Sequence, residues 1–173
     1  MKNPIQYYLI LTISLMISFC ACSSHKKEKI IELNQNIHHD DFEYAVTNFS
    51  KTTLITSGND TIRAKGNFYI VHFRVINKAM RVNHKWDNSI AYLVDENGNH
   101  YENNKVYQLV LNRSIPFGWQ EMYNTPHGQT DTTILVFDLP VDITQPYLMV
   151  RGDILMGDAF DGARFKKIKV KLF

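Results

Sequence analysis

Alternation of apolar and polar side chains is the feature that most constrains the fold of this chain. Tyr69, Val71, Phe73 and Val75 recur at every second position, which places them on one face of a β-strand. Further strands of this kind are predicted over 42–49, 61–64, 89–95, 132–139, 146–151 and 166–172, with a return strand from Tyr101. No segment after residue 22 has a clear helical stripe. Several short strands separated by turns predict an all-β fold, an antiparallel β-sandwich of about seven or more strands.

Turn residues separate these strands. Asn97-Gly98 follows the strand over 89–95 and supplies the positive-φ positions that a tight hairpin needs. Pro140 ends the strand over 132–139, because proline cannot donate a hydrogen bond to a neighbouring strand.

The first 22 residues differ from the rest. Lys2 is their only charged residue, and an apolar run of 15 residues from Tyr7 to Ala21 follows it. The length fits the hydrophobic region of a signal peptide, whereas a membrane-spanning helix needs about 20 apolar residues. An uncleaved anchor or a buried helix is the alternative. We predict a signal peptide over residues 1–21.

The segment Phe19-Cys-Ala-Cys22 resembles the lipobox of bacterial lipoproteins. In that family an apolar residue and small residues precede an invariant cysteine, which receives diacylglycerol and becomes the new N-terminus. Ala21 and Cys22 match this pattern, whereas Phe19 replaces the usual leucine. Cys20 is a weaker candidate because the bulky Phe19 precedes it. The resemblance therefore implies lipidation of Cys22, with the membrane as a partner through that lipid.

Cysteine counting agrees with this interpretation. Both cysteines lie in the leader, and none occurs from Ser23 to Phe173, so the mature chain can form no internal disulfide. A lone thiol in an exported protein is a reactive liability unless it is modified.

The polar segment after Cys22 predicts a flexible tether over residues 22–40, followed by the sandwich domain over 41–173.

Four motifs of this domain resemble a family of telokin-like, immunoglobulin-fold domains of unknown function in exported bacterial proteins. They are Phe73-Arg-Val-Ile-Asn77, Leu93-Val-Asp-Glu-Asn-Gly-Asn-His-Tyr101, Pro126-His-Gly-Gln-Thr130 and Leu135-Val-Phe-Asp-Leu-Pro140. His127 and the insert over 103–124 depart from the family pattern. The resemblance implies an immunoglobulin-like sandwich and an accessory or binding role, with no established reaction.

Charge and motif content argue against several functions. The formal net charge is +2, and nucleic-acid modules usually carry a clear basic excess, so we expect no nucleic-acid partner. No serine-hydrolase elbow, zinc-protease helix or phosphate-binding loop occurs. We therefore expect no enzyme, no catalytic residues and no cofactor.

Two acidic or histidine-rich clusters are candidate metal sites. His38-His-Asp-Asp41 has suitable ligands, but neighbours in a strand point to opposite sides. Asp153, Asp158 and Asp161 lack the spacing of an EF-hand. We expect no metal at either, and an enzyme or metal-dependent protein that uses histidines and aspartates remains the alternative function.

The insert between Tyr101 and Asp131 is the candidate recognition loop. Phe117, Trp119 and Tyr123 surround a turn-rich stretch, and long loops on a sandwich commonly carry recognition. The structural alternative is that the insert adds a strand over 106–111 and that its aromatic residues cover the core.

These observations together predict a non-catalytic interaction module of the cell envelope. The lipid on Cys22 would anchor this module to a membrane. We expect the outer membrane, with the module on either its periplasmic or its surface side. Its partner would be another envelope protein or a glycan, contacted through the loop aromatics.

Overall fold

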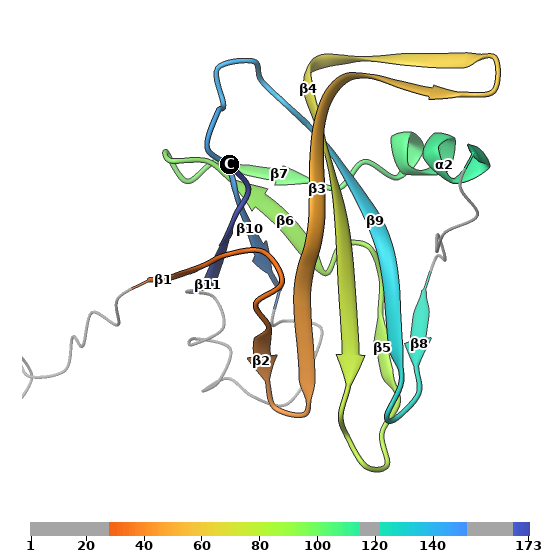
Figure 1. Cartoon of the computed structure of the whole chain (residues 1–173), viewed down its shortest axis with the longest axis vertical. Helices are drawn as coiled ribbons and strands as arrows, with labels where there is room; N and C mark the ends of the chain where they lie inside the picture. Colours follow the sequence, from red (N-terminus) through yellow and green to blue (C-terminus); the bar gives the residue numbers. More distant parts are fainter. Residues whose placement is uncertain (1–27, 115–121, 152–167) are drawn as a thin grey trace, which may run out of the picture.

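Two β-sheets pack face to face and enclose the main hydrophobic core (Figure 1). The computed structural model describes residues 28–114, 122–151 and 168–173. One sheet has the strand order β1-β11-β10-β6-β7 and the other β2-β3-β4-β9, while β5 and β8 form a two-stranded ribbon. The bounds are β1 Lys29–Ile31, β2 Ile37–His39, β3 Phe42–Ser57, β4 Asp60–Asn77, β5 His84–Trp86, β6 Ala91–Val94, β7 His100–Glu102, α2 Lys105–Ser114, β8 Tyr123–Thr125, β9 Thr130–Leu139, β10 Tyr147–Val150 and β11 Ile168–Lys171.

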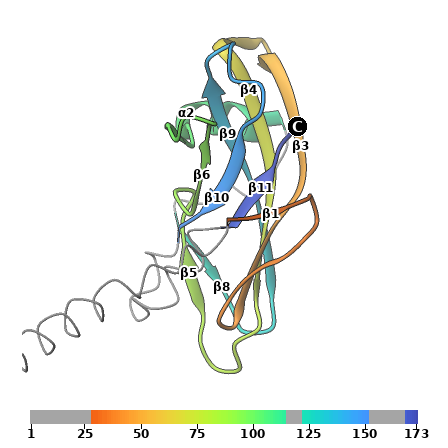
Figure 2. The same ribbon diagram turned by 90° about the vertical axis from the view of Figure 1, so that its left-hand side faces the viewer.

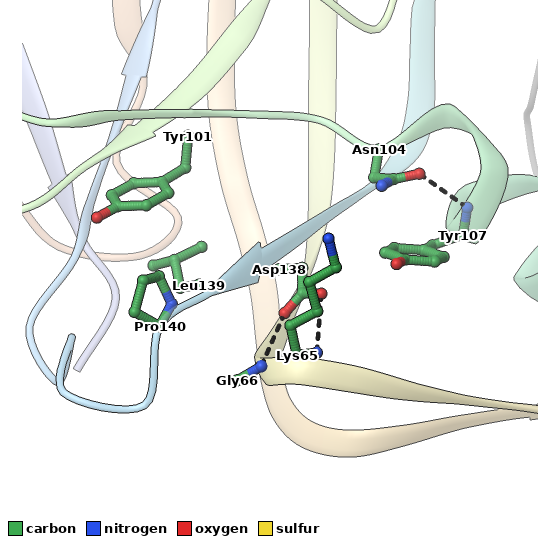
Figure 3. A pocket seen from close by; sticks show the side chains of 8 residues that line it. All are labelled: Lys65, Gly66, Tyr101, Asn104, Tyr107, Asp138, Leu139 and Pro140. Atoms are coloured by element: carbon green, nitrogen blue, oxygen red, sulfur yellow. Dashed lines mark hydrogen bonds between the residues drawn. The ribbon is translucent and has the colours of Figure 1, made fainter.

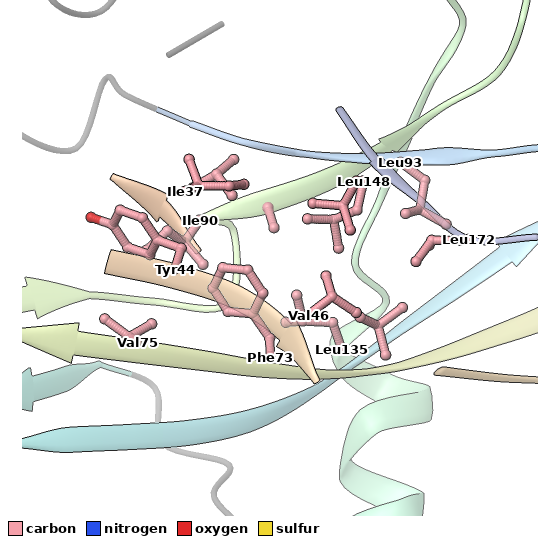
Figure 4. Close-up of a cluster of buried hydrophobic side chains, with 14 of the residues drawn as sticks. Ile37, Tyr44, Val46, Phe73, Val75, Ile90, Leu93, Leu135, Leu148 and Leu172 are labelled. Carbon is pink, nitrogen blue, oxygen red and sulfur yellow. The ribbon is translucent and has the colours of Figure 1, made fainter. Parts of the chain in front are cut away.

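The predicted all-β sandwich is confirmed. Among the described strands, all pairs are antiparallel except β1 with β11. The alternating side chains of β4 point into the core, where Phe73 and Val75 belong to the same buried cluster as Leu93 and Leu148 of the opposite sheet (Figure 4). Burial of this apolar surface is the main source of stability for such a fold.

The β6–β7 hairpin forms where the sequence predicts it. Gly98 has a φ of 82°, and the Asp95 carboxylate accepts hydrogen bonds from the backbone amides of Asn97 and Asn99 at 2.9 and 2.8 Å. A side-chain hydrogen bond from Asn99 at 2.8 Å is the largest cause of the lowered pKa of Asp95, and the two backbone bonds lower it further. The turn is therefore fixed by the motif that separates the two strands.

The flexible tether predicted for residues 22–40 is wrong over its described part. Lys29–Ile31 forms β1, which pairs in parallel with β11, and Ile37–His39 forms β2, which pairs with β3. Ile31 and Ile37 are buried in the main core. The pairing partner of β1 lies at the far end of the chain, so no local pattern shows it. The domain therefore includes residues from Lys29 onward.

The strands predicted over 42–49 and 61–64 are parts of one long hairpin. β3 and β4 pair from Phe42 with Asn77 to Ser57 with Asp60, with bulges near residues 47 and 53. The tip of this hairpin, residues 54–63, is called the arm below. Figure 1 shows the arm bending away from the sandwich and passing over α2, and Figure 2 shows the same bend from the side.

The strand considered for residues 106–111 is a helix instead. Asn104 caps α2, because its side-chain oxygen accepts hydrogen bonds from the amides of Val106 and Tyr107 at 3.1 and 3.2 Å. Tyr107, Val110 and Leu111 then share one helical face. Among the described residues, no helix has the length and apolar composition to cross a membrane.

A second, smaller core lies on the outer face of the four-stranded sheet. Its buried members come from β3, β4, β9 and α2: Ile55, Phe68, Val110, Ile134 and Val136. β9 is therefore buried on both faces at this end, which explains the unbroken apolar run Ile134-Leu-Val-Phe137. The helix and the arm together cover one end of this face.

Candidate functional site

The structure describes one of the three residues of the predicted recognition loop, Tyr123. Tyr123 is described and fully buried: its ring stacks on Trp86 with centroids 3.9 Å apart and an interplanar angle of 6°. Its hydroxyl donates a hydrogen bond to the Thr133 side chain at 2.8 Å. Recognition by Tyr123 is therefore wrong, and this residue belongs to the core as the structural alternative proposed. Phe117 and Trp119 lie outside the described residues, as does Cys22.

The His38–Asp41 cluster is divided as the alternation of a strand requires. The exposed His38 ring lies 3.1 Å from the Glu43 carboxylate, whereas His39 is buried on the other side of β2. Within the described ranges, no three histidine, cysteine, aspartate or glutamate side chains gather as metal ligands. Asp153, Asp158 and Asp161 lie outside those ranges.

A hollow beside the start of α2 is the first candidate site. It has a volume of about 520 Å³ and is called the α2 groove below. Its walls come from β4, β9, β7 and the helix (Figure 3). The residues that line it are Lys65, Gly66, Tyr101, Asn104, Tyr107, Asp138, Leu139 and Pro140.

Three of the polar side chains that line the α2 groove, those of Asp138, Asn104 and Tyr101, hold the fold together. The Asp138 carboxylate accepts hydrogen bonds from the backbone amides of Lys65 and Gly66 at 3.0 and 3.2 Å (Figure 3). Asn104 caps α2, and the Tyr101 hydroxyl donates to Asp95 at 3.1 Å. The groove is thus bounded by the contacts that attach the arm and the helix to the sandwich.

The second candidate site is a set of three turns at the opposite end of the sandwich. Residues 40–41, 78–83 and 126–129 meet there, at the bottom of Figure 1, and are called the loop end below. Lys78 donates its backbone amide to the Asp41 carbonyl at 2.7 Å, and Gly128 donates its amide to the Asn77 carbonyl at 2.8 Å. Sandwich domains commonly recognise partners through loops gathered at one end.

Asn77, the last residue of β4, organises the loop end. Its side chain is fully buried and donates to the carbonyls of Val82 at 2.7 Å and Thr125 at 3.0 Å. The same amide accepts a hydrogen bond from the Ala79 backbone at 2.9 Å. One side chain therefore closes the 78–82 turn and joins it to β8.

The turn that Asn77 closes exposes two large apolar side chains. Met80 is 80% exposed and Val82 is 58% exposed, and the exposed Arg81 lies between them in the chain. A turn closed by buried hydrogen bonds holds these side chains outward at a low further entropic cost on binding. This surface has no role in the described core.

A carboxylate and its partners flank the loop end on the sheet. Glu43 is nearly inaccessible and is contacted by the Lys78 amine, by Asn36 at 2.7 Å and by His38. The hydrogen bond from Lys78 is the largest cause of the lowered pKa of Glu43, and burial opposes it. The contact between Lys78 and Glu43 therefore attaches the first residue of the exposed turn to β3.

A buried histidine lies below the same turn. His84 Nε2 is 2.9 Å from the Tyr44 hydroxyl, and the His84 ring stacks on Phe42 at 4.1 Å. Burial, with a smaller effect of His39, lowers the pKa of His84 to about 4. Burial also raises the pKa of Tyr44. His84 is therefore neutral near pH 7 and belongs to the support of the loop end.

Sequence reasoning missed Met80 and Val82. The available signal was their position: they follow the strand that ends at Asn77, in a turn that contains neither glycine nor proline. Apolar residues in such a turn usually find a core. The turn that exposes them is joined to β8 by the bond from Asn77 to Thr125, 48 residues away, which the sequence does not show.

Comparison with known proteins supports the fold. No protein-family model matches the sequence, and neither does any curated protein. The yjhA protein from Bacillus subtilis aligns with a TM-score of 0.55 and 12% identity, over 82% of this chain and 98% of that chain. MPT63, a secreted protein from Mycobacterium tuberculosis, aligns with a TM-score of 0.52 and 12% identity, over 85% and 99%.

An uncharacterized β-sandwich protein from Clostridium difficile aligns with a TM-score of 0.50 and 12% identity, over 87% of this chain and 98% of that chain. The structural neighbours are thus secreted or uncharacterized β-sandwich proteins. At this level of identity, the likeness establishes the sandwich fold alone.

Proposed function

We propose that this chain is an exported lipoprotein, anchored in the cell envelope through Cys22, whose sandwich binds another envelope protein through the loop end. The observation that carries the binding role is the exposure of Met80 and Val82 on a turn closed by the buried Asn77. Methionine and arginine, which this turn exposes together, are enriched in protein interfaces. The segment Phe19-Cys-Ala-Cys22 supports the anchor.

The chemistry of the loop end favours a protein over a glycan. Sugar faces are usually bound by exposed aromatic rings, and the aromatic residues beside the described loop end, Phe42 and Tyr44, are buried. Methionine adapts its shape to an apolar pocket, and Arg81 beside it suits a carboxylate at the rim of that pocket. The partner surface is therefore an apolar depression with an acidic rim.

The test is affinity capture from detergent-solubilised envelope with the full-length lipoprotein as bait. The double variant Met80→Ser/Val82→Ser should lose the proteins that the wild type retains. Val106→Ser/Met122→Ser is the matched control, because these residues are 64% and 59% exposed elsewhere. It should retain those proteins.

Each outcome has a direct interpretation, provided that both variants melt at the wild-type temperature. Loss with Met80→Ser/Val82→Ser alone supports the loop end as the binding site. Equal capture by all three proteins would refute binding through this end. Loss with the control pair alone would move the site to the insert.

A further inference from the structure

From the start of β1 and the composition of one sheet face, we infer that the outer face of the five-stranded sheet lies flat on the bilayer that holds the lipid. This inference rests on the proposed anchor at Cys22. The occupant of the face is the headgroup layer of a phospholipid membrane. The loop end, at the tips of other strands, then remains available to a partner.

The first argument is the reach of the chain. β1 begins at Lys29, so only residues 23–28 separate Cys22 from the sheet. Seven extended peptide units span at most about 25 Å. The folded domain therefore cannot move far from the membrane, and the edge strand β1 is its nearest element.

The second argument is the composition of the outer face. Three aromatic rings on it each have a cation above them: Arg151 over Tyr92 at 4.9 Å, Lys169 over Tyr147 at 5.6 Å and Lys171 over Phe173 at 4.8 Å. Tyrosines at the level of the headgroups, with lysine and arginine beside them, are typical of membrane–water interfaces. Figure 2 views the molecule from the side of β1, β11, β10 and β6, which carry most of these residues.

The third argument is charge. Each cation also has a carboxylate partner: Lys169 lies 2.7 Å from Glu28, Lys171 lies 3.9 Å from Glu32, and Arg151 contacts Glu102. A face of paired opposite charges complements a zwitterionic headgroup, which carries both a phosphate and an ammonium group. Because the charges on this face are paired, the face has little net attraction to anionic lipid. Contact with the membrane should therefore not require anionic lipid.

Within the described ranges, part of the outer face of the other sheet is already occupied. One end of it is covered by α2 and the arm. β1 is also the edge strand of the five-stranded sheet, so the tether enters beside the aromatic face. The short tether and the aromatic face thus lie on the same sheet.

The test measures the distance of three positions from the lipid headgroups. Single cysteines carrying a fluorophore are placed in the lipidated full-length protein at Ile30, Glu102 or His72, all exposed. The vesicles contain phosphatidylcholine and phosphatidylethanolamine with a headgroup nitroxide quencher. Ile30 pairs with Lys169 on the tether side, while Glu102 lies four strands away on the same face, about 19 Å from β1. His72 is the matched control on the outer face of the other sheet.

Quenching of at least about twofold at both Ile30→Cys and Glu102→Cys, with His72→Cys unchanged, supports the inference. Quenching at Ile30→Cys alone would overturn it, because only the tether edge would then approach the lipid. Equal quenching at Glu102→Cys and His72→Cys would overturn it as well. Failure of the protein to float with the vesicles would instead refute the lipid anchor, and the membrane orientation with it.

Discussion

The two ends of the four-stranded sheet use similar contacts between polar side chains and the backbone, with different results. At the arm, Asp138 and Asn104 bind backbone amides and attach an added hairpin and helix to the sandwich. At the loop end, Asn77 likewise binds backbone, but the turn that it closes exposes Met80 and Val82. The α2 groove thus follows from how the arm is attached. The exposed apolar turn has no such structural explanation, so it is the better candidate for function.

The largest effect should come from crowding the attachment of the arm. A Cβ at Gly66 would lie 2.0 Å from the Leu139 carbonyl oxygen, so Gly66→Ala must force β4 away from β9. We expect a loss of about 3 kcal/mol or more in the free energy of unfolding, measured by denaturant titration. Lys65→Ala, at the exposed neighbour, is the control. A Gly66→Ala variant as stable as that control would contradict the close approach of the two strands.

Acidification should weaken the loop end through His84. Its pKa is about 4 in the folded protein and about 6.5 in the unfolded chain, so the unfolded chain binds a proton first as the pH falls. The stability from neutral His84 is present above pH 6.5 and is lost as the pH falls from about 6.5 to about 4. The expected loss is about 2–3 kcal/mol.

Comparison with His84→Gln isolates this contribution. Glu43 and Asp95 also have lowered pKa values, so both proteins should lose stability in acid, mainly below about pH 4.5. The free energy of unfolding should decline more steeply for the wild type between pH 6.5 and 4. Parallel curves would mean that His84 is not buried as a neutral ring.

Removal of the central side chain of the loop end should have a slightly smaller effect on stability. Asn77→Ala removes two donated hydrogen bonds and one accepted hydrogen bond, and we expect a loss of about 2 kcal/mol. Amide hydrogen exchange should also become faster at Ala79. Unchanged exchange there would show that the turn does not depend on Asn77.

The smallest effect on stability should come from the exposed residues themselves. Met80→Ser/Val82→Ser should change the free energy of unfolding by less than about 0.5 kcal/mol, as is usual for surface substitutions. Thermal denaturation of the purified variant measures this. A much larger loss would show that the two side chains pack against the protein, and the contrast between the two ends would then disappear.

Most of the sandwich could be predicted from local sequence patterns, and the candidate site could not. The alternation in β4, the burial of Leu135, Phe137 and Leu139, and the turn at Gly98 depend on near neighbours in the chain. β1 was missed because its parallel partner, β11, lies about 140 residues away. The helix α2 was missed because its apolar face is short and depends on packing against the arm.

The same limit applies to the functional residues. Tyr123 was a reasonable candidate for recognition because an aromatic residue stands in a long insert, yet Trp86 from a distant strand buries it. Met80 is exposed because Asn77 bonds to Val82 and to Thr125, which lies 48 residues further along the chain. Contacts of this kind set exposure, and exposure distinguishes a binding surface from a core.

Metabolic labelling with a clickable fatty acid tests the proposed anchor most directly. The wild type should be labelled and should float with membranes, and Cys22→Ser should do neither, while Cys20→Ser should behave as the wild type does. Labelling that persists in Cys22→Ser and disappears in Cys20→Ser would show that the lipid is on Cys20 and that our assignment to Cys22 is wrong. The absence of label in the wild type would contradict the lipoprotein proposal itself.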